Sequence, residues 1–381
     1  MNKFTIGLLS SVLISTPLWA GSDYSNWSDK TVCRLIKSTQ SVEYANIALQ
    51  RGLSCAGAVS VDQVDKALVP KRHDYAGHTV LSATDVSSKT VKLVEKWLTV
   101  AENSWFTKSD AAKDLYGPII ITIAGTSGKA GEVLEQEFCE LVKSEYPKGY
   151  PYTKCAQTNQ SGCTGACFIA DYARLGGASI TGSRIQEGFH LMIMAGKYPA
   201  PKEEDYKKTV LHEAFHIFQL SHIGRPGHQH FLETMGRATG GYNKDVPWWS
   251  EGVAEYMALA LYSRQPRVSS RYLREQMGYK LDYHGSGSAP VIREYLRAGG
   301  QLYNYDYSNE SQFGTRLGPW FAAYLVSNEG EQKIFDFYAN VEELGFESSF
   351  VQNFGKPYRD YVADFDLFID QPMSKLLKII P

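Results

Sequence analysis

Long apolar segments and a strong excess of one charge are both missing from most of this sequence. After the first twenty residues, no stretch is apolar enough to form a membrane helix. The 381 residues include 39 basic and 41 acidic ones, for a formal net charge of -2. This balance excludes a strong attraction to nucleic acid or to an anionic membrane surface. Repeats and low-complexity tracts are lacking too, and 43% hydrophobic residues are enough for a sizeable buried core.

The first twenty residues have the order of a signal peptide. Lys3 gives a short positive region, residues 4–14 are mostly apolar but short for a membrane span, and Ala20 is the candidate cleavage position. The alternative is a buried N-terminal helix. No cysteine follows the cut, so a lipoprotein anchor is not indicated. We therefore expect an exported protein, periplasmic or secreted, without stable membrane insertion.

Cysteine is absent after residue 167, and an even number in an exported chain is typical of disulfides. Local spacing favours a bond between Cys33 and Cys55, and it makes Cys163 and Cys167 a candidate tight loop. The alternative is a structural zinc site built from Cys155, Cys163 and Cys167. The six cysteines are Cys33, Cys55, Cys139, Cys155, Cys163 and Cys167.

Hydrophobic periodicity predicts an α+β chain. We expect short helices from 21 to about 75, strands over 119–123 and 189–194, and a loop over 221–246. Further helices are expected over 86–105, 131–144, 203–220, 247–263, 317–328, 331–340 and 358–369. The predicted organisation is a signal peptide (1–20), an N-terminal helical region with disulfides (21–115), an upper subdomain with the motif helix (116–246) and a helical lower subdomain (247–381).

The residues that carry chemistry begin in the helix predicted over 203–220. His212 and His216 are four positions apart, so both imidazoles lie on one helix face and can bind one cation. Glu213 is offset along the helix and can reach a water on that cation. This is the H-E-x-x-H pattern of zinc metalloproteases. Two core or surface histidines on a helix are the alternative.

A second motif supplies the missing ligand. Glu251 follows His216 by thirty-five positions, and a catalytic zinc needs a third protein ligand beside an open position. Glu255 lies one turn further on the same face, where it can accept the free N–H of a ligand histidine. The apolar residues around both glutamates argue against the alternative, a solvated helix face.

The sequence HEAFH at 212–216, followed by WWSEGVAEY at 248–256, resembles the gluzincin metallopeptidases of clan MA. These include thermolysin-like enzymes and the bacterial collagenases, whose Glu-Gly-x-Ala-Glu-Tyr version is the most similar. The resemblance covers 210–260 and extends weakly into the C-terminal helices. It implies a zincin-like fold, with a small mixed sheet, an active-site helix and a mainly helical C-terminal subdomain that carries Glu251.

The motif and the resemblance together predict a zinc-dependent peptidase with one Zn²⁺ per chain. Glu213 would be the general base, and the substrate a peptide or an exposed protein segment. The resemblance also implies an oxyanion donor downstream of the glutamate ligand. We select Tyr307, while Tyr303, Tyr305 and His284 stay open.

Other histidines are expected to be structural. His222, His228 and His230 follow the motif helix, and we expect them in a solvated loop. The strand Phe189 to Met194 is a candidate for pairing with an extended substrate. Two other functions stay open, a non-catalytic zinc-containing binding protein and a metal hydrolase that acts on another substrate.

Overall fold

The computed structural model describes ten stretches of the chain. They are 28–34, 69–106, 116–146, 169, 178–196, 203–225, 230–234, 248–281, 294–302 and 307–381, except positions 32, 182–183, 231–232, 295 and 301. The predicted signal peptide lies outside the described residues, and so do four of the six cysteines. Cys33 and Cys139 are described, and neither is free. The proposed pairings therefore stay predictions.

A five-stranded mixed sheet forms one half of the molecule, with the order β1-β2-β3-β5-β4. The central strands β2, β3 and β5 are parallel, and the edge strands β1 and β4 are antiparallel to their neighbours. The strands are β1 (Lys71–Tyr75), β2 (His78–Ser82), β3 (Ile119–Ala124), β4 (Ala178–Thr181) and β5 (His190–Ala195). This confirms the predicted α+β class with a small mixed sheet, and the strands expected at 119–123 and 189–194.

Two predictions about this sheet are wrong. Residues 71–82, expected in a helical region, form the hairpin of β1 and β2, and β2 pairs with β3. Exposed polar side chains dominate β1, so it lacks the apolar alternation that predicts a strand. The strand at 190–195, expected to be free to bind substrate, is paired on both sides, with β3 and β4.

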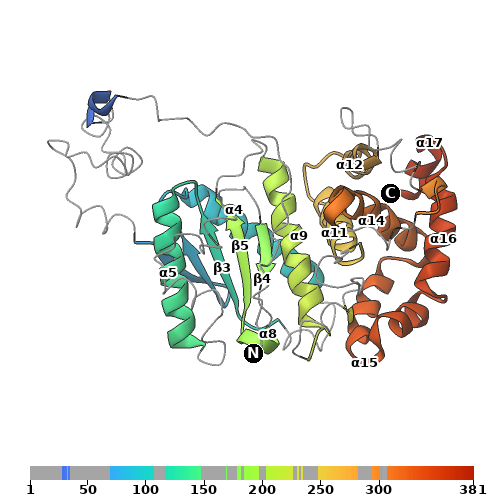
Figure 1. Cartoon of the computed structure of the whole chain (residues 1–381), viewed down its shortest axis with the longest axis horizontal. Coiled ribbons are helices and arrows are strands. Elements are labelled where there is room, and N and C mark those ends of the chain that lie inside the picture. Colours follow the sequence, from blue (N-terminus) through green and yellow to red (C-terminus); the bar gives the residue numbers. More distant parts are fainter. Residues whose placement is uncertain are drawn as a thin grey trace, which may run out of the picture.

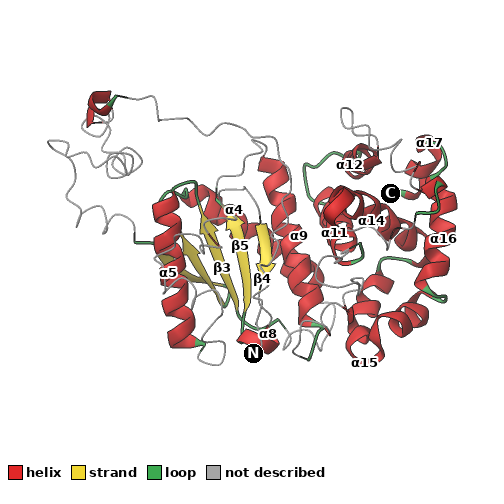
Figure 2. Cartoon of the chain, in the orientation of Figure 1, coloured by secondary structure: helices red, strands yellow, loops and turns green. Residues whose placement is uncertain are grey.

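Helices surround the sheet and then continue alone. In Figure 1 the sheet lies between α5 and α9, and the C-terminal helices lie on the far side of α9. Figure 2 shows that half built from helices in its described part. The helices of eight or more residues are α4 (Ser88–Trp105), α5 (Gly128–Glu145), α9 (Glu203–Ser221), α11 (Ser250–Ser263), α12 (Tyr272–Leu281), α14 (Tyr307–Glu329), α15 (Gln332–Phe354) and α16 (Tyr358–Ile369).

These bounds confirm the helices predicted from residue 86 onward, although α14 and α15 are longer than expected. Short elements complete the described fold: α8 (Arg184–Glu187), α17 (Met373–Leu376) and a 3₁₀ turn, η5 (Leu377–Ile379). Within α15, Gly345 has a positive φ of 76° and breaks the helical geometry. Glycine adopts this conformation at little cost, so α15 continues past a kink that looks like a helix end in sequence.

Helices α11 and α14 cross so closely that both contact positions require glycine. A Cβ on Gly252 would lie 2.5 Å from the carbonyl carbon of Gly318, and a Cβ on Gly318 would lie 2.5 Å from the carbonyl oxygen of Trp248. Only glycine at both positions lets the two backbones approach this closely. Because Gly252 follows Glu251 directly, the crossing sets the position of that carboxylate.

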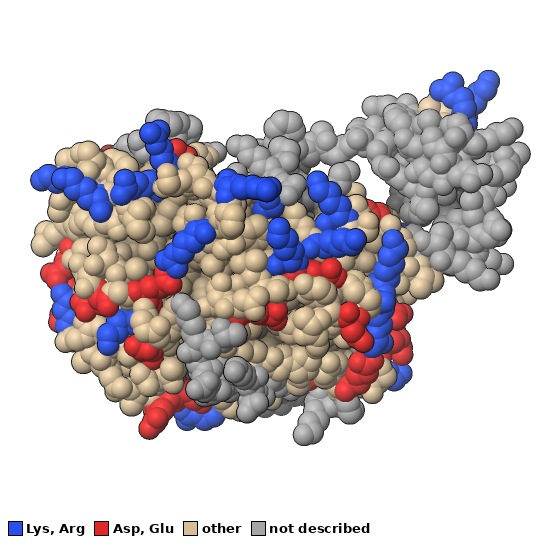
Figure 3. Space-filling model, turned by 180° about the vertical axis from the view of Figure 1, so that it is seen from behind, with Lys and Arg blue, Asp and Glu red and all other residues tan. Residues whose placement is uncertain are grey.

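Charges are unevenly distributed on the surface. Seen from behind, lysine and arginine side chains gather along the upper part of the molecule, while most acidic side chains lie lower (Figure 3). The near-zero net charge therefore does not describe this face. No described helix combines the length and apolarity that a membrane crossing requires.

Candidate metal centre

Helix α9 is held from several sides, and this fixes the direction of its two histidines. Phe215 packs edge-on against Trp105 of α4, with ring centroids 5.0 Å apart, and Phe218 meets Phe335 of α15 at 5.4 Å. Both phenylalanines are buried. Since His212 and His216 lie on another face of the same helix, this packing turns them toward α11, which also contacts α9.

Three ligand atoms converge between α9 and α11. Nε2 of His212 lies 3.0 Å from Nε2 of His216, and Oε2 of Glu251 lies 3.2 and 3.3 Å from these two nitrogens. A tetrahedral ion bound at about 2.0–2.1 Å separates its ligand atoms by about 3.3–3.4 Å. The triangle matches one face of such a coordination sphere, so these residues could hold a metal ion. The structure thus brings the three predicted ligands together.

The electrostatics of the group favour a cation. Burial opposes a charge on His212, but hydrogen bonds to Glu251 and Glu255 outweigh it and raise the pKa of His212 well above its usual value. Burial also opposes the charge on Glu251, but both histidines outweigh it and hold the pKa of Glu251 well below its usual range. A proton and a metal ion therefore compete for this group, and metal binding releases protons.

His212 has an outer partner on α11, as predicted. Its Nδ1 donates to Oε2 of Glu255 across 3.1 Å, so its Nε2 lone pair faces the ligand triangle. The other oxygen of Glu255 accepts a hydrogen bond from Nζ of Lys280 at 2.7 Å. Burial would raise the pKa of Glu255, but Lys280 and His212 lower it well below its usual value. Lys280 was not identified from sequence, because nothing local links α12 to this site.

His216 has a different set of partners. Its Nδ1 donates to Oε1 of Gln219 across 2.7 Å. The amide nitrogen of Gln219 donates to the carbonyl oxygen of Ser250 at 3.0 Å and to the hydroxyl of Tyr338 at 2.7 Å. Gln219 is fully buried. It links His216 to the residue that precedes Glu251, and the i,i+3 spacing to His216 was the only sequence signal for it.

Glu213 is buried beside the ligand triangle and is not one of its members. Burial raises the pKa of its carboxyl group, the two histidines lower it, and the neighbouring glutamates raise it again, for a net increase. A carboxylate with a raised pKa is a stronger proton acceptor than an exposed one. The arrangement combines a cation site with an adjacent base.

The remaining predictions have mixed outcomes. Tyr307 begins α14, but its side chain is not among those described. Four further residues lie outside the described ranges: His228, His284, Tyr303 and Tyr305. Two histidines expected in a solvated loop have protein partners instead: His222 is buried and His230 is half-buried.

His222 is buried and its Nδ1 donates to the carbonyl oxygen of Phe218 at 2.8 Å, while burial lowers its pKa. His230 contacts Glu342 of α15 at 2.8 Å. Arg225 also bonds Glu342, at 2.8 Å, so the segment after α9 is tied to the helical half.

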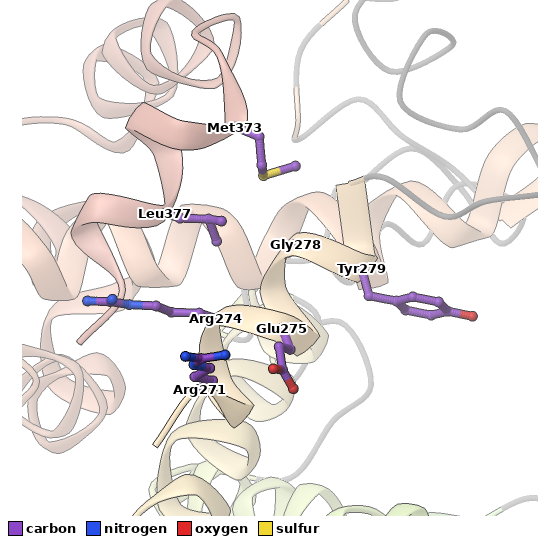
Figure 4. A pocket seen from close by; sticks show the side chains of 7 residues that line it. All are labelled: Arg271, Arg274, Glu275, Gly278, Tyr279, Met373 and Leu377. Atoms are coloured by element: carbon purple, nitrogen blue, oxygen red, sulfur yellow. The ribbon is translucent and has the colours of Figure 1, made fainter. Parts of the chain in front are cut away.

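A cavity of about 470 Å³ lies elsewhere, between α12 and the short C-terminal elements α17 and η5 (Figure 4). Tyr279 points away from its centre, and Met373 and Leu377 face it from the opposite side. The cavity contains none of the four motif residues. We therefore place the candidate site at the ligand triangle.

Comparison with models of known protein families found no match, and comparison with curated proteins found no similar sequence. The function has to be argued from the geometry of the centre.

Proposed function

We propose that this protein is an exported zinc-dependent metallopeptidase of gluzincin type. The observation that carries the proposal is the ligand triangle of His212, His216 and Glu251, with Glu213 buried beside it. Two histidines and one glutamate are the ligand set of a catalytic zinc with an open position. A structural zinc site usually has four protein ligands and does not need a base.

The protein side chains have separate roles. When bound, zinc lowers the pKa of a coordinated water and polarises a carbonyl group. Glu213 accepts a proton from the attacking water at its carboxylate and delivers it to the leaving nitrogen. Glu255 and Gln219 each hold a histidine by its Nδ1 hydrogen, so neither ring rotates away from the centre. The proposed oxyanion donor remains Tyr307.

The substrate strand is reassigned from β5 to β4. Among the described strands β4 pairs with β5 and lies at the edge of the sheet, and an edge strand is where an extended peptide can add to a sheet. Helix α9 packs against β4. A peptide that extends the sheet at this edge would therefore lie beside the helix that carries both histidines.

The test is digestion of a mixed peptide library by the zinc-loaded protein, read by mass spectrometry, with Glu213→Ala as the matched control. We expect cuts by the wild type and at least a roughly hundredfold lower rate in the variant, because the general base is lost. Zinc content should be unchanged in Glu213→Ala and lost in His216→Ala.

Equal cutting by the wild type and Glu213→Ala would refute the role of Glu213. A folded, zinc-loaded wild type that cuts no peptide would favour the alternative, a non-catalytic zinc-containing binding protein.

A further inference from the structure

A mostly buried lysine contacts Glu255, the outer partner of His212, from a helix that contributes no ligand. Lys280 of α12 has a side chain that is 16% exposed, and its Nζ is 2.7 Å from Oε1 of Glu255. Oε2 of the same carboxylate accepts from Nδ1 of His212 at 3.1 Å. Each oxygen of Glu255 therefore has its own partner, and together they prevent the carboxylate from rotating.

Helix α12 is itself fixed on two sides. The indole nitrogen of Trp320 on α14 donates to the carbonyl oxygen of Met277 at 2.9 Å. Nζ of Lys208 on α9 donates to the side chain of Gln276 at 3.3 Å. These bonds involve the residues three and four positions before Lys280. The ammonium group is thus held relative to α9, the helix of both histidines, and relative to α14.

Among the described residues, the ammonium of Lys280 completes the charge balance of the centre. Three buried or mostly buried carboxylates surround the site, those of Glu213, Glu251 and Glu255. A divalent ion neutralises two of these charges, and the ammonium of Lys280 neutralises the third. Unpaired buried charges are costly, so a centre without Lys280 would leave a carboxylate uncompensated.

We propose that Lys280 is a positioning residue of the metal centre, which acts through Glu255 to hold His212 in its metal-binding orientation. The proposal rests on the proposed function only in assuming that the centre binds zinc. Without the ammonium group, Glu255 loses one of its two hydrogen bonds and its carboxylate is free to rotate. Its hold on the Nδ1 hydrogen of His212 then weakens.

The test is a double-mutant cycle on zinc affinity, measured by competition with a chelator. Lys280→Met should weaken zinc binding about tenfold, as is typical for outer partners of metal ligands. Lys280→Arg, which keeps a charged donor, should restore most of it. In the Glu255→Gln background, Lys280→Met should have less than about a twofold effect, because its target is already altered.

The direction of the change in zinc affinity distinguishes a positioning role of Lys280 from a purely electrostatic one. Loss of a positive charge alone would tighten binding of a cation, so an unchanged or tighter affinity in Lys280→Met would overturn the proposal. An equal loss in the Glu255→Gln background would overturn it as well.

The matched control is Lys356→Met, which removes an ion pair with Asp364 in the helical half, away from the centre. It should leave zinc affinity unchanged. Chemical unfolding of the metal-free proteins verifies that each variant is folded before titration. Peptide cleavage is not part of this readout, so a wild type that binds zinc but cuts nothing refutes the proposed function and leaves this inference intact.

Discussion

The two halves of the molecule contribute to the candidate metal centre in different ways. The sheet half supplies His212 and His216 from one helix, four residues apart, so their spacing follows from helix geometry alone. The helical half supplies Glu251, whose position depends on how α11 packs against α9 and α14. A local contact defines two ligands, and long-range packing defines the third.

The hydrophobic cores of the two halves also differ in composition: one is mainly aliphatic and the other is rich in aromatic residues. The buried strands of the sheet half are mainly aliphatic, as in Ile119–Ala124. In the helical half, Trp249 lies within aromatic contact of Phe337 and Phe350, with centroids 4.9 and 5.5 Å apart. Trp249 directly precedes the first turn of α11, close to Glu251. The comparison indicates that changes in the packing of α11 should affect metal binding through the position of Glu251, while the four-residue spacing of the two histidines is unchanged.

The largest effect is expected from Gly252→Ala, which tests the link between helix packing and Glu251. The added methyl would lie 2.5–2.6 Å from two backbone atoms of Gly318, which cannot move cheaply. We expect the free energy of unfolding to fall by about 3 kcal/mol. Zinc affinity should fall too, because α11 moves. Urea unfolding and zinc titration measure these effects.

The matched control is Gly278→Ala on α12, where the nearest atom to the new methyl is 3.9 Å away. This change should raise stability by about 0.5–1 kcal/mol through helix propensity. If Gly252→Ala kept the zinc affinity of the wild type, the helix crossing would not determine the position of Glu251.

An intermediate effect is expected from Gln219→Leu, at the boundary of the two halves. Leucine leaves the Nδ1 of His216 and the carbonyl oxygen of Ser250 without their partner, in a buried region. We expect a loss of about 2 kcal/mol in unfolding free energy and a roughly tenfold weaker zinc affinity. Gln265→Leu, which removes one half-buried bond to the carbonyl oxygen of Leu261, should leave zinc affinity within about twofold of the wild type. Equal affinities in the two variants would contradict the role of Gln219.

The smallest effect is expected far from the centre, at Asp366 of α16. Its Oδ1 is buried without a partner among the described residues, and burial raises the pKa of Asp366 to about 6. The unfolded value is about 3.9. The folded state therefore binds the proton more tightly, and stability from this group falls as pH rises from about 4 to about 6.

Asp366→Asn should remove this loss. Its Tm should exceed that of the wild type by roughly 1–2 °C at pH 7, with the gain disappearing near pH 4. Differential scanning fluorimetry across this range measures the difference. A difference in Tm between the two proteins that stayed constant from pH 4 to pH 7 would show that Asp366 does not titrate in this range.

The features that could be predicted from sequence are those that depend on local spacing along the chain. The helix periodicity of 203–220 and the i,i+4 histidines are local, and the structure confirms the helix and their convergence. Glu251 and Glu255 were identified because their motif is itself local to α11. The ligand triangle was therefore predictable before any long-range contact was known.

The missed side-chain contacts depend on distant parts of the chain, and the missed strands lack a clear apolar alternation. Lys280 acts on Glu255 from another helix, and Tyr338 reaches Gln219 across 119 positions. The strand β4 is only four residues long, too short for a clear alternation. Whether the protein has the complete zincin fold and cleaves peptides remains a prediction.

The two edges of the sheet differ in one further respect, which concerns association between chains. Edge strand β1 has the sequence KRHDY, with its four polar side chains exposed. Charged residues on an edge discourage another strand from adding there, whereas the ASIT sequence of β4 has no charge. Strand addition at β1 is thereby disfavoured, whereas a strand that approached β4, such as the proposed substrate, would meet no charged side chain of that strand.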